Sequence, residues 1–314
     1  MRYRMMTGPM HDDFNREVHE AAMKDGRYVI PIEGMKFCLK EIGIGAFARV
    51  HLGRDEDGNY LALKVFKNER DLKSKSATAI EYRKACLRER EEIFKEDPFA
   101  KLRCVFNSGN NYGFVGEYFD GIDVARGFYR SPPVIDDKVI DFTDRELQAK
   151  LFGAYVGLLK SLHAKGMLVF DNSWRNVMVN HDEVRVIDPD SVRSFEELET
   201  LRFDWLKRGY SPLYASFAQV SGEGYSESVD LEGVALMIDR FFCGDDGFFK
   251  KYREDDVEDI LQRVRQEKRN YPVRRVRKIP HRLREYVVQV ISKPTKHGMT
   301  LSDLESAVNH TFNL

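Results

Sequence analysis

Two aspartates and an asparagine fall close together in the segment LVFDNSWRNVMVNHDEVRVIDPD. Asp171 ends a short apolar run, Asn176 follows five residues later, and Asp188 ends a second apolar run. The patterns VMV and VRVI lie on either side of a turn, so we expect these side chains at the ends of paired short strands. Each acid taken alone could equally be an ordinary turn residue.

Together, the three side chains suit phosphoryl transfer. Mg²⁺ prefers oxygen ligands, which predicts a metal-binding role for Asn176 and Asp188. Asp171 would then orient an attacking hydroxyl and accept its proton.

A single lysine lies within an apolar strand pattern, LALKVF, upstream of these acids. Strand alternation places Ala62 and Lys64 on one face. A buried cation is costly without an anionic partner, and phosphate oxygens together with a helix carboxylate would serve. Glu89 is the favoured carboxylate because it shares the apolar face of the helix expected downstream, with Glu81 and Glu91 as alternatives. A solvated helix face is the other interpretation of each glutamate.

Glycines punctuate the first strand pattern, in IGIGAFARV over residues 42–50. Ile42, Gly43 and Gly45 belong to a strand–turn–strand pattern. Glycine lets a backbone approach a phosphate closely and present free N–H groups. The alternating run that follows disfavours a dinucleotide-binding fold, which needs a helix at this point. The segment is therefore a candidate phosphate-binding turn, with a plain hairpin turn as the alternative.

Strand patterns dominate the first third of the chain and helical patterns dominate the rest. Residues 1–35 form a polar extension with one short helix expected at 13–24. We expect strands around a hairpin turn at DEDGN, a helix over 75–96, and strands at LRCVFNSG and YGFVGEYF. Helices are expected at 144–165, 226–243, 255–268, 281–292 and 301–312. The expected domains are an extension 1–35, a first lobe 36–120 and a second lobe 121–314.

Composition limits the class of protein. The chain has 314 residues, of which 42% are hydrophobic and 32% charged, with a net charge of −1, so it can bury a core and is not a general polyanion binder. Its four cysteines stand at no metal-ligand or disulfide spacing and are expected to be reduced thiols. No stretch approaches the roughly 20 apolar residues of a membrane span, and the N-terminus lacks the apolar core of a secretory signal. We therefore expect a cytoplasmic protein.

Basic residues concentrate late in the chain, where residues 263–284 include ten lysines and arginines. A solvated helical face with internal ion pairs is the plain interpretation. The sharper hypothesis is a docking patch for an acidic partner, such as an acidic protein or a lipid headgroup, with nucleic acid disfavoured.

The ordered set of motifs resembles that of the eukaryotic-type protein kinases, from about residue 36 to the C-terminus. GIGAFARV is similar to the family's glycine-rich loop, LALK to its VAIK strand, VFDNSWRN to its HRDLKPEN loop and DPD to its DFG. EYFDGID resembles the hinge, YSPLYASFA the TPxYxAPE segment, and SVDLEGVAL the helix after it, with Asp230 as a structural acid. The implied fold is α+β and bilobal, with a small β-rich N-lobe that has one main helix and a larger α-helical C-lobe.

The resemblance implies a phosphotransferase that moves the γ-phosphate of ATP to a protein hydroxyl with Mg²⁺, or Mn²⁺, as the metal. Asp171 would orient the acceptor, Lys64, paired with Glu89, would hold the phosphates, and Asn176 and Asp188 would hold the metal. The implied nucleotide site comprises Ile42, Gly43, Gly45, Val50, Ala62, Lys64, Glu117, Phe119, Asp123 and Met178. Within it, the hinge backbone would bind adenine at Glu117 and Phe119, and Asp123 would lie near the ribose.

Several positions depart from the family pattern. The HRD histidine and arginine are Val169 and Phe170, the DFG phenylalanine and glycine are Pro189 and Asp190, the lysine after the catalytic aspartate is Ser173, and the APE glutamate is Ala218. The late arginine that pairs with that glutamate also has no counterpart, so no buried charge is stranded. The residues that carry the chemistry are all retained.

Acceptor specificity receives two conflicting signals. Ser211 occupies a position where the family's serine/threonine kinases carry a hydroxyl and its tyrosine kinases carry proline. Ser173 replaces the lysine of the family's serine/threonine kinases, and Arg175 stands where many of its tyrosine kinases carry arginine, so both favour tyrosine. Another donor can supply the positive charge that the lysine would provide. We therefore predict a serine/threonine kinase. The alternatives are a non-catalytic kinase-like interaction module (a pseudokinase) and a small-molecule phosphotransferase of the same fold.

Overall fold

The chain divides into two compact units in the computed structural model. The N-terminal unit is Met1–Gly121 with Val134–Val139, and the C-terminal unit is Ile122–Pro133 with Ile140–Leu314. The structure describes residues 40–44, 48–55, 57–66, 93–95, 98–108, 111–125, 134–135, 138–181, 183–200, 211, 214–221, 224–243, 275–293 and 298–314. Outside the described residues lie Gly45, Glu81, Glu89 and Glu91, the expected helices 13–24 and 255–268, and nearly all of the expected helix 75–96.

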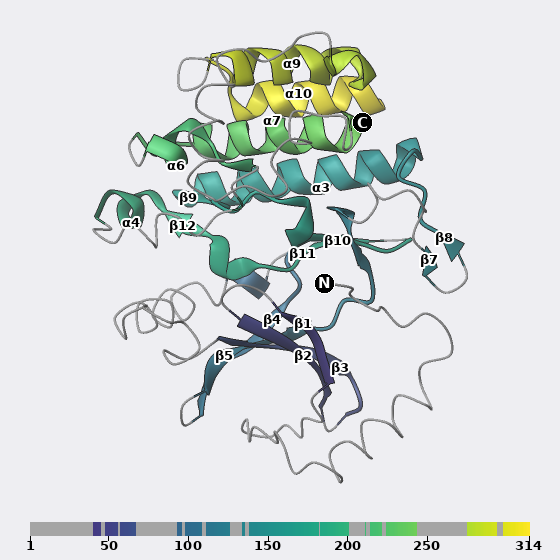
Figure 1. Cartoon of the computed structure of the whole chain (residues 1–314), viewed down its shortest axis with the longest axis vertical. Helices are drawn as coiled ribbons and strands as arrows, with labels where there is room; N and C mark the ends of the chain where they lie inside the picture. The colour runs from purple at the N-terminus through teal and green to yellow at the C-terminus, as the bar shows by residue number, and fades with distance from the viewer. Residues whose placement is uncertain are drawn as a thin grey trace. The chain divides into compact units, whose positions relative to one another are not determined.

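A five-stranded antiparallel sheet in the order β1-β2-β3-β5-β4 forms the N-terminal unit (Figure 1). Its strands are β1 (Lys40–Ile44), β2 (Ala48–Arg54), β3 (Tyr60–Phe66), β4 (Leu102–Ser108) and β5 (Asn111–Glu117). The hairpin predicted at DEDGN is confirmed, because β2 and β3 pair across it and the Asp55 carboxylate accepts the Asn59 N–H at 2.7 Å. The remaining short elements of this unit are η1 (Ile93–Lys95), β7 (Val134–Ile135) and β8 (Lys138–Val139).

The two faces of the β3 strand differ in burial. Leu61 and Leu63 are fully buried in a core cluster with Val115, while Ala62 and Lys64 alternate with them and are only partly buried. Strands β3 and β5 lie so close that a Cβ at Gly113 would sit 1.8 Å from the Lys64 carbonyl oxygen. A glycine is therefore required on β5 at this point to bring the two central strands together.

Helices make up most of the described part of the C-terminal unit (Figure 1). They are α3 (Arg145–Ala164), α4 (Phe195–Thr200), α6 (Phe217–Ser221), α7 (Ser228–Cys243), α9 (His281–Ser292) and α10 (Leu301–Phe312), with a short η7 (Arg275–Lys278). Helix α10 packs on α3 and α9, and α9 packs on α7. The predicted helices 281–292 and 301–312 are confirmed with the same bounds, and those at 144–165 and 226–243 to within two residues.

Two small sheets connect these helices. They comprise β6 (Ile122–Asp123), β10 (Val177–Val179) and β11 (Val184–Val186), in the order β11-β10-β6, and the pair β9 (Met167–Leu168) with β12 (Arg193–Ser194). The two short strands predicted around HDE are confirmed as β10 and β11. Their turn is closed by the Asn180 N–H, which donates to the Glu183 carbonyl at 3.1 Å.

Aromatic side chains fill the core between α3, α7 and α10. Phe152 stacks on Phe312 with ring centroids 5.7 Å apart, and its edge meets Trp174 at the same centroid distance. Trp174 belongs to η3 (Trp174–Asn176), is 1% exposed, and donates its indole N–H to the Met237 carbonyl at 2.6 Å. This contact fixes η3, and with it Asn176, to α7. Among the described helices, none is both long enough and apolar enough to cross a membrane.

Candidate functional site

Asp171 lies in a tight turn after β9 formed by residues 169–172, which we call the 169–172 turn. The Asp171 N–H donates to the Val169 carbonyl at 2.8 Å, and Phe170 has a left-handed φ of 64°. A bulky L-residue in this region loses roughly 1–2 kcal/mol. The Phe170 side chain is buried at 1% exposure, and its carbonyl accepts the Gln219 side-chain N–H at 2.5 Å. Contacts from outside the turn must therefore offset its backbone strain.

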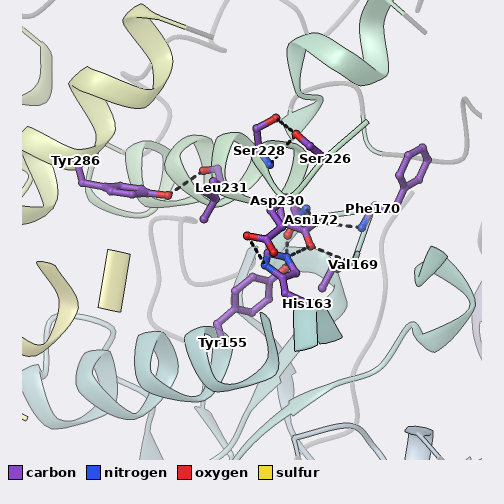
Figure 2. Close-up of polar contacts among 11 residues, drawn as sticks. Tyr155, His163, Val169, Phe170, Asn172, Ser226, Ser228, Asp230, Leu231 and Tyr286 are labelled. Atoms are coloured by element: carbon purple, nitrogen blue, oxygen red, sulfur yellow. Dashed lines mark hydrogen bonds and ion pairs between the residues drawn. The ribbon is translucent and has the colours of Figure 1, made fainter. Parts of the chain in front are cut away.

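The Asp230 carboxylate on α7 holds the 169–172 turn (Figure 2). It accepts the N–H groups of Val169 at 2.9 Å and Phe170 at 3.2 Å, and the Asn172 side-chain N–H at 2.7 Å. His163 Nε2 on α3 lies 3.0 Å from its Oδ2 atom. Asp230 is fully buried, and a buried carboxylate is tolerated when hydrogen bonds replace its water. These contacts match the structural role that the kinase resemblance implies for Asp230.

Asn172 and Tyr155 are part of this site, although sequence reasoning did not single them out. The Tyr155 hydroxyl on α3 donates to Asn172 Oδ1 at 2.7 Å (Figure 2). Burial, with smaller contributions from the negative charges of Asp230 and Asp171, raises the pKa of Tyr155 well above its usual value, so the hydroxyl stays a donor. The available sequence signal was an amide directly after the candidate catalytic acid and a lone phenol on the apolar face of α3.

The Asp171 carboxylate receives a donor on each oxygen. The Ser211 backbone N–H donates to Oδ1 at 2.6 Å, and Asn176 Nδ2 donates to Oδ2 at 3.3 Å. Asn176 Nδ2 also donates to the Asp171 main-chain carbonyl at 3.1 Å. The structure thus brings together three residues singled out by sequence, Asp171, Asn176 and Ser211. It makes the Ser211 contact through the main chain, which no side-chain pattern could signal.

Asp188 follows β11 and begins a tight turn, η4 (Pro189–Ser191). The Ile187 N–H donates to the Asn176 carbonyl at 2.9 Å, which sets the residue before Asp188 beside the asparagine. The Ser191 hydroxyl donates to the Asp188 carbonyl at 2.8 Å. Pro189 suits the first position of this turn because its φ is already fixed and it has no N–H to satisfy. The DPD sequence therefore builds a closed turn directly after the second acid.

The oxygen donors of this unit fit a hard divalent cation. Asn176 uses Nδ2 to bind Asp171, which leaves its Oδ1 as the amide oxygen able to act as a ligand, and Asp188 supplies a half-buried carboxylate. The described residues contain no group of three or more His, Cys, Asp or Glu side chains placed for a metal. Close by, Asp123 on β6 is the cross-strand neighbour of Met178 on β10.

In the N-terminal unit, three predicted nucleotide-site residues share one face of the sheet. Val50 is the cross-strand partner of Lys64, and Ala62 lies two residues before that lysine on the same side. Lys64 Nζ lies 5.6 Å from the ring centroids of Phe66 and Phe114. The aromatic faces stabilise the ammonium group by cation–π attraction. The predicted alternation is therefore confirmed, while Glu89 lies outside the described residues.

The other predicted nucleotide-site residues of this unit belong to β1, the end of β5 and the segments that follow these strands. Glu117 ends β5, and its N–H donates to the Lys101 carbonyl at 2.8 Å. Phe119 follows two residues later and is half-buried. At the first strand, Ile42 is 38% exposed and Gly43 sits where the β1–β2 register shifts. Gly45 lies outside the part of the chain that the structure describes.

Comparison with known proteins decides the family. A family model described as the protein kinase domain matches residues 38–312. The chain belongs to the protein kinase family. Its α+β kinase fold, predicted from the motif order, is thereby confirmed.

One curated relative of this kinase is a probable cAMP-dependent protein kinase catalytic subunit from Encephalitozoon cuniculi (strain GB-M1). The two sequences are 23% identical over 240 residues, which is 74% of this chain and 68% of the relative. The family match and this relative establish a protein-kinase-type phosphotransferase.

This kinase lacks the histidine of the HRD motif, yet an imidazole from another element contacts the carboxylate that holds the same turn. His163, near the end of α3, contacts Asp230, while Val169 at the motif position contributes its main-chain N–H. His163 Nδ1 lies 3.7 Å from Glu227 Oε2. The polar anchoring of the kinase turn is thus supplied by α3 and by Asn172 rather than by the motif side chains.

The kinase segment that replaces APE is held in a similar way. Ala218, at the position of the family's glutamate, is fully buried in α6. A carboxylate from α7 serves the start of this helix instead, since Glu232 Oε2 accepts the Phe217 N–H at 2.7 Å. Ser216 and Gln219 exchange side-chain and main-chain hydrogen bonds at 3.1 and 2.8 Å, which forms a capping box. Sequence reasoning missed Glu232 and Gln219, because both resemble solvated polar residues.

Proposed function

We propose that this protein kinase is an active enzyme that transfers the γ-phosphate of ATP to a serine or threonine hydroxyl of a protein substrate. Asp171 orients the hydroxyl and accepts its proton. Asn176 and Asp188 hold Mg²⁺ or Mn²⁺, and Lys64, paired with Glu89, contacts the phosphates. We place the protein in the cytoplasm, which supplies both ATP and Mg²⁺.

The observation that carries this proposal is the state of the Asp171 carboxylate. A donor reaches each of its oxygens, Ser211 N–H at 2.6 Å and Asn176 Nδ2 at 3.3 Å. These contacts fix the orientation of the carboxylate, which is what a base that must orient its substrate requires.

The nucleotide contacts are assigned from the resemblance of the sequence motifs to those of the family. A bound divalent cation would neutralise phosphate oxygens and the charge that develops on transfer. The amide oxygen of Asn176 and the carboxylate of Asp188 are the donors that we assign to it. We assign adenosine and phosphate contacts to Ile42, Gly43, Gly45, Val50, Ala62, Lys64, Glu117, Phe119, Asp123 and Met178.

The preference for serine and threonine is supported by how position 211 contacts the base. The Ser211 backbone N–H donates to Asp171 Oδ1, and a proline at this position could not make the contact because it has no N–H. Ser173 is 1% exposed and accepts the Arg175 N–H at 3.3 Å, so it caps η3. Arg175 is exposed and is our candidate for the positive charge that the family's lysine supplies.

The test is transfer from γ-labelled ATP with Mg²⁺ to a generic protein substrate, followed by phosphoamino-acid analysis. We expect phosphoserine and phosphothreonine, and a loss of at least about 100-fold in kcat for Asp171→Asn, the scale of general-base catalysis. The matched control is Asp144→Asn, because Asp144 caps α3 and asparagine caps helices equally well. Mg-ATP at 100 times its Kd should add roughly 2.7 kcal/mol to the free energy of unfolding of both variants.

Three outcomes would replace this proposal. Label found only as phosphotyrosine reverses the acceptor preference, and label found only on a small molecule favours the small-molecule phosphotransferase. A melting temperature that millimolar ATP with Mg²⁺ or Mn²⁺ leaves unmoved favours the non-catalytic kinase-like module.

We further propose an acidic protein segment as a partner of the basic stretch 263–284. Its described part leads into a groove of about 850 Å³ between α9 and α10. Arg284 donates to the carbonyls of Arg277 and Ile279, so its charge is not neutralised by a carboxylate among the described residues. Arg277 and Lys278 are exposed beside it. These basic residues precede α9 next to the groove, which Arg284 lines together with Glu285 and Asp303.

The partner is tested by titrating a polyglutamate peptide at low and high salt. Reversing the exposed pair, Arg277→Glu with Lys278→Glu, should weaken binding, and 0.5 M salt should do the same because exposed charges are screened. The control makes the same change of charge on α3, Lys150→Glu with Lys160→Glu. Equal binding by both double variants would contradict the proposal.

A further inference from the structure

Asn172 and Tyr155 form a two-step connection between α3 and α7 that passes directly beside Asp171. Tyr155 OH donates to Asn172 Oδ1 at 2.7 Å, and Asn172 Nδ2 donates to Asp230 Oδ1 at 2.7 Å (Figure 2). The Asn172 side chain is therefore bound at both ends of its amide group. It is 3% exposed, so water does not offer alternative partners.

The connection holds the part of the turn that follows Asp171, which is bound to Asp230 through a side chain and not through main-chain N–H groups. The Val169 and Phe170 N–H groups tie the residues before Asp171 to Asp230. After Asp171, the Asn172 side chain is what reaches the same carboxylate. Asp230 thus binds the chain on both sides of the proposed base, and the second attachment depends on a side chain rather than on the backbone.

The close packing of α7 shows that this attachment has a defined position. Gly233, one turn along α7 from Asp230, faces Asn172 so closely that a Cβ there would lie 2.8 Å from Asn172 Cβ and 2.9 Å from its Nδ2. The asparagine is therefore confined by Gly233, oriented by Tyr155 and anchored by Asp230. A leucine, which the family's loop carries after the aspartate, would bring no polar atoms to these partners.

We propose that Asn172 and Tyr155 are positioning residues that hold Asp171 in its productive orientation. This inference rests on the proposed role of Asp171 as the base. Tyr155 orients the Asn172 amide, the amide anchors the turn to Asp230, and the turn sets the direction of the Asp171 carboxylate. Neither residue contacts ATP in this scheme, so losing them should lower kcat and leave the KM for ATP unchanged.

The experiment compares two variants that each remove one buried hydroxyl facing α7. Tyr155→Phe breaks the contact with Asn172, whereas Tyr286→Phe breaks a 3.3 Å hydrogen bond to the Leu231 carbonyl on the same helix (Figure 2). We expect Tyr155→Phe to lower kcat roughly 10-fold with KM for ATP unchanged, and Tyr286→Phe to stay within about twofold of wild type. Equal kcat values for the two variants would overturn the proposal.

A double-mutant cycle separates positioning from general loss of stability. If Tyr155 acts through Asn172, adding Tyr155→Phe to Asn172→Ala should cause little further loss of kcat. Fully additive losses of kcat would show that Tyr155 acts independently of Asn172 and would contradict the proposal that it acts through this residue.

A second readout does not depend on activity. Amide hydrogen exchange at Ser211, whose N–H donates to Asp171 Oδ1, should speed up in Tyr155→Phe but not in Tyr286→Phe. Unchanged exchange at Ser211 would contradict positioning. If Tyr155→Phe exchanges faster than wild type at Ser211 but the wild type shows no transferase activity, positioning is supported and the proposed function is contradicted.

Discussion

Replacing Gly233 by alanine should destabilise the C-terminal unit, although the same change normally stabilises a helix. A Cβ at this position would lie 2.8 Å from Asn172 Cβ and 2.9 Å from both its Cγ and Nδ2. Separations under about 3 Å force something to move, and Asn172 is held by Tyr155 and Asp230. The asparagine must therefore shift away from at least one of its two partners.

The magnitude follows from three contributions. Inserting a methyl group into a packed interior costs roughly 1–3 kcal/mol. Weakening the hydrogen bond from Asn172 to the Asp230 carboxylate costs roughly 1.5–3 kcal/mol. Alanine returns about 1 kcal/mol of helix propensity. The net loss is about 3 kcal/mol, which corresponds to a fall in Tm of roughly 6–12 °C for a unit of this size.

The assay is thermal unfolding followed by circular dichroism, with Gly157→Ala as the matched control. Gly157 is an exposed residue of α3, and no atom lies within 4 Å of a Cβ built there. That variant should gain about 1 kcal/mol and raise Tm by roughly 2–4 °C. A Tm for Gly233→Ala at or above that of wild type would refute the reasoning about Asn172.

Four further predictions concern activity, the nucleotide pocket, a thiol and a helix cap. Phosphatase treatment should leave kcat unchanged, because Phe170 stands where the family's arginine receives a phosphate and a phenyl ring cannot pair with a dianion. A large loss of kcat that is restored by rephosphorylation of the segment after Asp188 would contradict this prediction. ATP competitors that carry a bulky substituent should bind at least as well as the same compounds without it, because Gly116 adds no side chain beside Ala62. Weaker binding of the substituted compounds in a competition titration would show that the alignment of EYFDGID with the family's hinge is wrong. Burial, followed by the charge of a nearby aspartate, raises the pKa of Cys243 to about 12, so the native protein at pH 8 should resist iodoacetamide there, as peptide mass analysis would show. Hydrogen bonds from Thr300 lower the pKa of Asp303. The ionised carboxylate therefore stabilises α10 fully at pH values above its ordinary pKa, and this stabilisation is lost as the pH falls through the lowered pKa. Asp303→Ala should accordingly show a smaller acid-induced fall in Tm than wild type.

The parts of this kinase that the sequence predicts well are those with local signals. Helices α9 and α10 match their predicted bounds because apolar residues recur at helical spacing and Thr300 and Asp303 form a capping box at the start of α10. The β10–β11 hairpin was equally clear, because two short β-branched runs surround a polar turn. In each case the stabilising contacts join residues that are near each other in the chain.

The missed parts depend on partners far away in sequence. Glu232 lies in a polar-looking stretch, and only the fold shows that it is 1% exposed and bonded to the Phe217 N–H. The contact between Tyr155 and Asn172 joins a helix to a turn across 17 positions. The Ser211 contact to Asp171 uses a main-chain N–H, which every residue except proline carries. No residue pattern could reveal these three contacts.

The main-chain donors of the 169–172 turn also bear on how kinases of this kind can diverge. Asp230 recognises positions 169 and 170 through their peptide N–H groups, which are chemically the same for valine, phenylalanine, histidine or arginine. A lineage can therefore exchange both side chains of its best-known signature without rebuilding the loop, provided that the acid on α7 persists. For the detection of remote kinases, an aspartate near the start of the helix that corresponds to α7 is thus a more durable marker than the two residues before the motif aspartate.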